Sequence, residues 1–331
     1  MPKDKIQQSF IQQQLHNETV KDNIQTIYQL AENHSSQELI QMLHQWSKTP
    51  PVLTVTNTLF WTLIGAAIGV GVLCLLIGLP LWAFILPIGI LVFAFIKKEN
   101  NKARNELFDF LRSKVLQDKY ELQFNTVLPN YTLNNLQQMF PLFGRGNHEN
   151  YISDSVSGFM NIAENEYPFT LYQYHYVNER SHRDQDGNVK YSYDHYDRWG
   201  IFISNIPYHG ISISNDQTKA CQLGMKWTTS DIQFNKKFKM SGNNEIDLAK
   251  FFNPARVMLL DQILAKDRID LILHPTHPVL CWQFEQNIFR VQPKQPAIHT
   301  IHHLAEFLEK LEMPEWEALR QKLTPLLEKM N

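Results

Sequence analysis

Residues 49–96 read TPPVLTVTNTLFWTLIGAAIGVGVLCLLIGLPLWAFILPIGILVFAFI and contain no Asp, Glu, Lys or Arg. A helix rises about 1.5 Å per residue, so about 20 residues span a hydrocarbon core of about 30 Å. The stretch is too long for one span and suits two, which we expect at Val52–Ile77 and Pro80–Ile96. Gly78 can end the first helix, and Pro80 suits the first position of the second. Because the second segment is short for a span, a buried re-entrant hairpin is the alternative interpretation.

Basic residues next to this apolar block predict its orientation. Lys48 precedes the first segment and a basic cluster follows the second, whereas the connecting turn carries no basic residue. The positive-inside rule then places both termini in the cytoplasm and the turn outside. Because no ionisable residue lies inside the spans, we expect no proton or ion pathway through them. The basic cluster consists of Lys97, Lys98, Lys102, Arg104, Arg112 and Lys114.

Gly65 and Gly69 form a small-xxx-small pattern in the first apolar segment. Such a pattern lets two membrane helices approach each other closely. The neighbour can be a second copy of the chain or the second helix of the same hairpin. Packing within the hairpin is the preferred interpretation.

The composition excludes several classes of protein. The net charge is -2, so no overall positive field favours nucleic acid. Cys74, Cys221 and Cys281 form no CxxC pair, so neither a disulfide framework nor a zinc ribbon is expected. The first fifty residues are polar and lack a short apolar segment behind a basic start, so we expect no signal peptide. A reducing, cytosolic environment for the polar part fits this pattern.

Three segments follow from the distribution of apolar residues. Residues 1–50 carry Ile24, Ile27, Leu39 and Leu43 at roughly helical spacing, which predicts cytoplasmic amphipathic helices that pack on the protein itself. Residues 51–97 form the predicted transmembrane hairpin. Residues 98–331 are expected to form one cytoplasmic domain.

The pattern of this third segment predicts an α+β fold with a mainly antiparallel sheet. Aromatic-rich alternation over Phe169–Val177 and Val189–Tyr196, with Asp186 and Gly187 between them, predicts a β-hairpin with a tight turn. Further strands are expected at Gly200–Ile206, Ile211–Ser214, Gln233–Met240, Ile269–Leu273 and Val279–Val291. Helices are expected at Asn101–Leu122, Thr132–Phe140, Ala249–Leu264, His299–Leu311 and Pro314–Met330.

Several stretches carry a resemblance to a known family. DIQFNKKFK at Asp231–Lys239 is followed by an Asn-Asn-Glu-Ile stretch and by FNPARVM at Phe252–Met258, while YISDSVSG at Tyr151–Gly158 and DRWGIF at Asp197–Phe202 lie upstream. Over roughly residues 50–310 the chain resembles the bacterial membrane proteins of the domain of unknown function 3137 family. The polar N-terminus and the Asp-rich hairpin at Ser181–Asp197 depart from that pattern. The resemblance implies a bacterial inner-membrane protein and no particular reaction.

Histidines are the candidates for chemistry in a chain that has 13 of them. His299, His302 and His303 lie at the start of a predicted helix, where His299 and His303 at i, i+4 would face one side, as metal ligands on a helix do. A solvated helix start is the preferred interpretation. His274 and His277 flank a proline turn, and they are expected in a solvated loop rather than at a metal.

The predicted hairpin gathers further histidines and carboxylates. Its spacing does not match an EF-hand calcium loop, because no Glu stands at the twelfth position. A charged hairpin tip is therefore the preferred interpretation, with a metal site as the alternative. The residues are His175, His182, His195, Asp184, Asp186, Asp194 and Asp197.

No nucleophile elbow, Walker loop, dinucleotide fingerprint or kinase signature occurs in the sequence, so no catalytic residue is assigned and no cofactor is expected. We expect a non-enzymatic protein, anchored in the bacterial inner membrane, that binds or scaffolds a protein partner or a second copy of itself. The alternatives are a metal-dependent enzyme and a sensor of a small ligand or lipid. Nucleic acid is not an expected partner.

Overall fold

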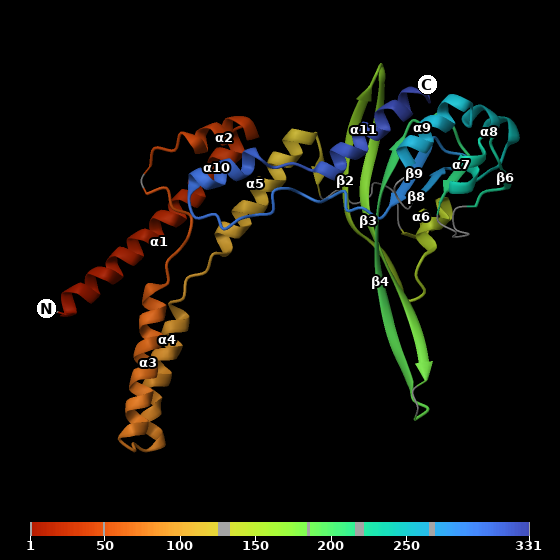
Figure 1. Ribbon diagram of the computed structural model, residues 1–331. Coiled ribbons are helices and arrows are strands. Elements are labelled where there is room, and N and C mark those ends of the chain that lie inside the picture. The colour runs from red at the N-terminus through yellow and green to blue at the C-terminus, as the bar shows by residue number, and fades with distance from the viewer. Residues whose placement is uncertain are drawn as a thin grey trace. The chain divides into compact units, whose positions relative to one another are not determined.

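Figure 1 shows the computed structural model of the chain, which describes residues 2–48, 50–124, 133–183, 186–215, 222–264 and 269–330. The chain forms two compact units. Unit 1 comprises Met1–Asp118 and Pro293–Leu311, and unit 2 comprises Lys119–Gln292 and Glu312–Asn331. This division differs from the expected boundary at residue 98, since residues 98–118 and 293–311 pack with the N-terminal helices.

Unit 1 is helical. Outside the apolar block its helices are α1 (Pro2–Asn33), α2 (Ser36–His44), α5 (Lys102–Tyr120) and α10 (Ile301–Glu309). A capping box of Ser35 and Glu38 starts α2, which packs against α10. Most of the apolar residues that recur at helical spacing in residues 1–50 therefore face the core of this same unit. The core contains Ile27, Leu39, Leu43, Leu107, Leu111, Leu304 and Leu308.

Two buried asparagines of α1 hold the chain that leads into the apolar block. Asn23 Nδ2 donates to the carbonyl oxygen of Val52 at 3.1 Å, and Asn17 both donates to and accepts from the backbone of Thr56. Because these contacts keep the segment out of a helix, the first apolar helix begins at Thr58. The predicted start at Val52 was wrong for this reason.

The apolar block folds as a helical hairpin of α3 (Thr58–Leu76) and α4 (Ile85–Ile96), joined through the 3-10 turn η1 (Leu81–Phe84). The residues buried between the helices recur every seven positions, as expected for two helices packed side by side. Gly65 and Gly69 lie elsewhere, because a Cβ atom on either would meet no atom within 4 Å. The expectation that they pack against the second helix was therefore wrong. The buried residues are Phe60, Ala67, Cys74, Pro87 and Ala94.

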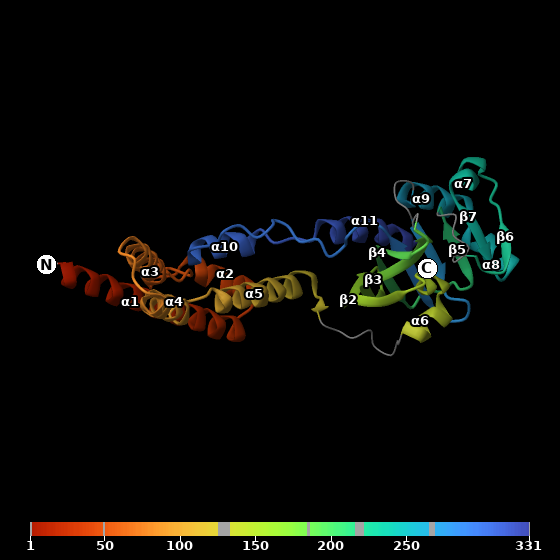
Figure 2. The same cartoon turned by 90° about the horizontal axis from the view of Figure 1, so that it is seen from below.

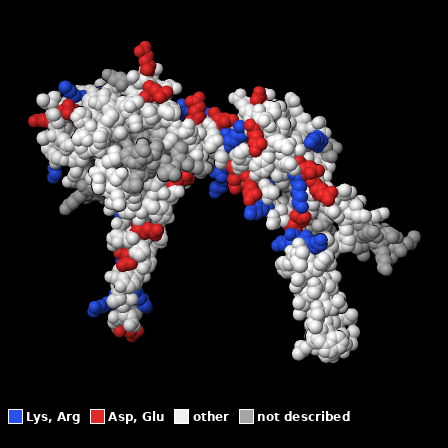
Figure 3. All heavy atoms as spheres, turned by 180° about the vertical axis from the view of Figure 1, so that it is seen from behind, with Lys and Arg blue, Asp and Glu red and all other residues white. Residues whose placement is uncertain are grey.

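The described residues support only part of the membrane prediction. Among the described residues, α3, with 19 residues, is the one helix that is both long and apolar enough to cross a membrane. Leu81–Ile96 is also apolar but falls short of that length, so the prediction of two spans is not confirmed. In Figure 3 the hairpin is a column without charged side chains, and Lys and Arg spheres gather at its upper end, where it joins the rest of unit 1.

Unit 2 is an α+β fold whose described residues form a nine-stranded antiparallel sheet of order β1-β2-β3-β4-β9-β8-β5-β7-β6. Its helices are α6 (Leu133–Met139), α7 (Ile232–Lys237), α8 (Glu245–Phe251), α9 (Pro254–Leu264) and α11 (Pro314–Glu328), with the 3-10 turn η2 (Pro141–Gly144). The predicted α+β class with a mainly antiparallel sheet is confirmed for this unit. The strands are β1 (Gln123–Phe124), β2 (Glu149–Ile162), β3 (Asn165–Arg183), β4 (Val189–Ser204), β5 (Ile211–Ser214), β6 (Met225–Trp227), β7 (Lys239–Gly242), β8 (Ile269–Leu273) and β9 (Val279–Phe284).

The sheet has a core on each face. On one face Trp316 of α11 packs on Phe169 of β3, with ring centroids 4.8 Å apart. On the other face Phe143 of η2 packs on Tyr172 and Tyr174. Figure 2 shows α9 and α11 on one side of the sheet and α6 on the opposite side. Alternate residues of β3 therefore enter different cores.

The predicted β-hairpin forms, and its strands β3 and β4 are both longer than predicted. β2 pairs with β3 only as far as Val177, and β9 pairs with β4 only from Trp199 onward. Beyond these points β3 and β4 form a ribbon, which we define as residues 178–183 and 189–198 (Figure 1). Gly187 near its tip has φ +84, as the predicted turn required.

Several predicted elements of unit 2 need correction. Gln233–Met240 is not one strand: Asp231 caps a helix by accepting from the N–H groups of Gln233 and Phe234, so α7 precedes β7. The helix expected over Ala249–Leu264 divides at Pro254 into α8 and α9. β9 ends at Phe284 rather than Val291, and Thr132, the first residue of the helix expected over Thr132–Phe140, lies outside the described residues.

Candidate functional site

The histidines at the start of α10 do not form the i, i+4 pair that was considered as a metal site. Thr300 is the N-cap and its hydroxyl accepts from His303 N–H at 3.3 Å, so the helix begins at Ile301. His299 therefore lies before the helix, where its Nδ1 is 3.1 Å from the Thr54 hydroxyl. The i, i+4 spacing on which a metal site at His299, His302 and His303 depended does not apply.

His274 is buried rather than solvated. Its Nδ1 accepts hydrogen bonds from the backbone N–H groups of Thr276 at 3.1 Å and His277 at 2.9 Å, and the ring meets Phe140 edge-on. Burial first, and the nearby His277 second, lower the pKa of His274. The neutral ring therefore closes the turn after β8, which is a structural role.

The long hairpin brings three of its predicted residues into contact. His175 Nδ1 lies 2.9 Å from Asp197 Oδ1, and His175 Nε2 lies 3.3 Å from His195 Nδ1. The register explains the arrangement, because His175 stands opposite Asp197 and His195 opposite Val177 on the same sheet face. We call His175, His195 and Asp197 the histidine triplet.

The remaining predicted residues of the hairpin lie apart from the histidine triplet. Asp194 pairs with Arg180, with 2.7 Å between Asp194 Oδ2 and Arg180 Nε. His182 stands opposite Lys190, seven positions further along β3 than His175. Asp186 lies beside Gly187 near the tip of the hairpin, and Asp184 lies outside the described residues.

Hydrogen bonds fix the orientation of the histidine triplet. The Asp197 carboxylate accepts from Gln173 Nε2 at 3.1 Å and from the Nδ1–H of His175. With its proton on Nδ1, His175 presents the lone pair of Nε2 to His195. The ring of Tyr151 on β2 lies 5.1 Å from that of His175, whose side chain is 16% exposed. No sequence pattern pointed to Tyr151 or Gln173 as neighbours of His175, because only the cross-strand register places them there.

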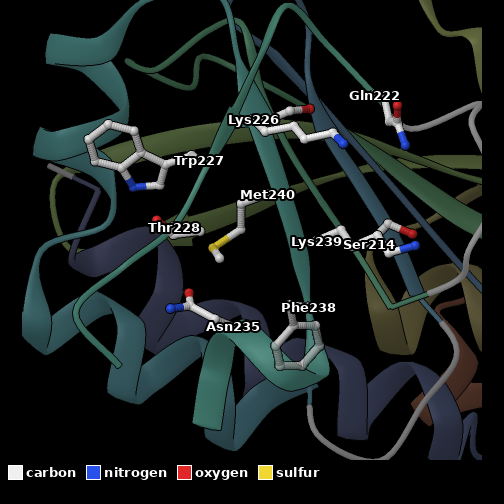
Figure 4. Close-up of a pocket in the computed structure, with 10 residues that line it drawn as sticks. Ser214, Gln222, Lys226, Trp227, Thr228, Asn235, Phe238, Lys239 and Met240 are labelled. Atoms are coloured by element: carbon white, nitrogen blue, oxygen red, sulfur yellow. The ribbon is translucent and has the colours of Figure 1, made fainter. Parts of the chain in front are cut away.

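A pocket lies at the other end of the sheet, beside β6, β7 and α7 (Figure 4). Its volume is about 260 Å³. Lys226 and Lys239 line it, and neither forms an ion pair with another described residue. The indole N–H of Trp227 is buried and has no acceptor in the described part of the chain. The other lining residues are Ser214, Gln222, Thr228, Asn235, Phe238, Met240 and Ser241.

Cys281 is fully enclosed in the core between the sheet and η2, with Tyr172 Oη 3.2 Å from its Sγ. Burial raises the pKa of its thiol to about 12, so the thiol stays protonated and unreactive at neutral pH. Cys74 is buried in the apolar hairpin, and Cys221 lies outside the described residues.

No protein family matches the chain, and neither a curated protein nor a solved structure does. The resemblance noted from the sequence therefore stays a prediction. Within the described ranges, no group of three or more His, Cys, Asp or Glu side chains is placed to hold a metal ion.

Proposed function

We propose that the chain is a membrane-anchored protein of the bacterial inner membrane whose polar part binds a protein partner. The anchor is supported by the outward-facing apolar surface of α3 and α4. Trp61, Leu76 and Ile85 on that surface are all largely exposed, and a surface of this kind is typical of contact with lipid. The resemblance to bacterial membrane proteins supports the same placement.

The ribbon of β3 and β4 is the observation that carries the binding function. Over residues 191–197 no described strand pairs with the outer edge of β4, so this stretch of the strand offers an edge to which a partner strand can add. Tyr191, Tyr193 and Tyr196 are exposed along this edge strand. Tyrosine is enriched at protein interfaces because it contributes both apolar area and a hydrogen-bonding group.

In-cell photo-crosslinking tests the binding function. A photoreactive phenylalanine analogue replaces Tyr191 in one variant and Met258 of α9, which is also exposed, in a control variant. We expect the Tyr191 variant to form a reproducible crosslink to one protein, identified by mass spectrometry, and the Met258 variant to lack it. No crosslink at Tyr191, or the same products at both positions, would contradict a docking role for the ribbon.

Two spans with both termini in the cytoplasm are the topology that we propose. Reporter fusions before Pro2 and after Asn331 test it, because two spans leave the termini on one side and a single span leaves them on opposite sides. We expect both reporters to show a cytoplasmic location. Opposite locations would mean that α3 alone crosses the membrane.

A sensor of a small anion is a second candidate function, favoured by the pocket beside β6. Its two lysines and the buried indole N–H of Trp227 are all donors suited to carboxylate or phosphate oxygens. Thermal shift with inorganic phosphate and with small carboxylates tests it. We expect stabilisation of the natural protein, no stabilisation of a Lys226→Gln/Lys239→Gln variant, and an unchanged response in the exposed control Lys236→Gln. Equal responses in the natural protein and both variants would exclude the pocket as the anion-binding site.

A further inference from the structure

The distance between the two histidines of the histidine triplet fits a bound metal ion. Two nitrogen ligands at about 2.0–2.1 Å from a tetrahedral ion lie about 3.3–3.4 Å apart. His175 Nε2 and His195 Nδ1 are 3.3 Å apart, which is longer than the separation of about 2.9–3.0 Å typical of an N–H donor and its acceptor. The separation of the two nitrogens is therefore that of two ligands of one ion.

Asp197 holds His175 in the orientation that a metal ligand needs. Metal-binding histidines usually donate their second ring N–H to a carboxylate, which fixes the tautomer and raises the basicity of the ligating nitrogen. The contact of 2.9 Å between His175 Nδ1 and Asp197 Oδ1 has this arrangement. Gln173 holds the carboxylate in turn, so Asp197 acts through His175 and does not itself contact the ion.

The surroundings of the pair suit an ion with open coordination positions. His175 is anchored in the middle strand between β2 and β4, and regular strands hold a ligand more rigidly than loops do. His195 on the neighbouring strand is exposed, so the ion is accessible from solvent. Neutral imidazoles suit zinc, copper and nickel, whereas magnesium and calcium prefer oxygen ligands.

We propose that His175 Nε2 and His195 Nδ1 bind one late first-row divalent ion, with Asp197 as a positioning residue and water or an external donor in the remaining positions. The site is independent of the proposed docking function of the ribbon. The expected order of affinity places Cu²⁺ above Zn²⁺ and Ni²⁺.

Titration of the full chain in detergent, purified without a histidine tag, tests the proposal with Zn²⁺ and Cu²⁺ as probes. Isothermal titration calorimetry measures Zn²⁺ affinity and stoichiometry, and electron paramagnetic resonance of the Cu²⁺ form counts the nitrogen ligands. The variants are His175→Gln, His195→Gln and Asp197→Asn. His182→Gln is the matched control, since His182 lies on the same hairpin but outside the histidine triplet.

We expect one ion per chain and a Cu²⁺ spectrum with two nitrogen ligands. His175→Gln and His195→Gln should each abolish this site, Asp197→Asn should weaken affinity by about 10–100-fold at unchanged stoichiometry, and His182→Gln should match the natural protein. Circular dichroism checks the folding of each variant. If His175→Gln misfolds, the result for His195→Gln is used instead, because His195 is exposed. Absence of a one-to-one site, or a site that survives in His195→Gln, would overturn the proposal.

Discussion

The Asp270→Asn substitution tests how unit 2 is stabilised. Asp270 of β8 has a side chain only 4% exposed, and its carboxylate pairs with the guanidinium of Arg145. The Ser214 hydroxyl donates to its other oxygen at 2.6 Å. The substitution leaves the Arg145 guanidinium facing a neutral amide. The free-energy cost of removing that charge from water is then no longer offset by a carboxylate.

The expected loss follows from this burial. Removing one partner of a buried ion pair costs about 3–5 kcal/mol in the free energy of unfolding. In a unit of this size each kcal/mol corresponds to about 2–4 °C in melting temperature, so we expect a decrease of about 6–20 °C. The Arg145→Met/Asp270→Leu double variant should recover part of it, because apolar residues can replace a buried pair.

The assay is thermal unfolding of the full chain in detergent, followed by tryptophan fluorescence. Asp261→Asn is the matched control: Asp261 pairs with Lys237 at 2.8 Å, but its side chain is 35% exposed. Such a surface pair contributes about 0–1 kcal/mol, so the control should lose less than about 4 °C. Equal decreases for Asp270→Asn and Asp261→Asn would refute the reasoning.

Two further predictions concern single positions. Because the folded state lowers the pKa of His274, its contribution to stability is present above about pH 6.5 and is lost as pH falls below that value. His274→Asn keeps an acceptor for the turn but cannot titrate, so its melting temperature should fall less than that of the natural protein between pH 8 and pH 5.5; parallel curves would contradict this. At Gly200 a Cβ atom would overlap the Tyr172 phenol and lie 2.7 Å from the Trp282 carbonyl oxygen, so Gly200→Ala should cost about 1–3 kcal/mol in thermal unfolding. Gly144→Ala, at a position with open space, should be near neutral, and a neutral Gly200→Ala would mean that the strands can move apart.

The sequence determined those features that depend on neighbouring residues alone. The uncharged stretch located the hairpin of α3 and α4, because hydrophobicity accumulates along the chain without reference to other segments. Alternation located β3 and β4, and Asp186-Gly187 placed the turn between them. The α+β class followed from the same local patterns.

Contacts distant in sequence decided the element boundaries that were predicted wrongly. The segment before α3 stays outside the helix because Asn17 and Asn23 of α1 bind its backbone. Gly65 and Gly69 are left open because the seam of the hairpin follows Phe60, Ala67 and Cys74 instead. An apolar helix offers several faces for packing, and only the position of the second helix selects one.

The histidine triplet depends on the register of β3 against β4, which the tertiary structure alone decided. A two-residue turn at Asp186-Gly187 would place Arg198 opposite His175, but the structure pairs Arg183 with Val189 and therefore Asp197 with His175. Packing provides the reason, since the Tyr172 ring occupies the space that Gly200 leaves open opposite it. A shift by one residue would set Ile201 against that ring and turn every side chain of the strand to the other face. Strand periodicity sets which residues alternate, and the fit of Tyr172 to Gly200 determines which of them meet.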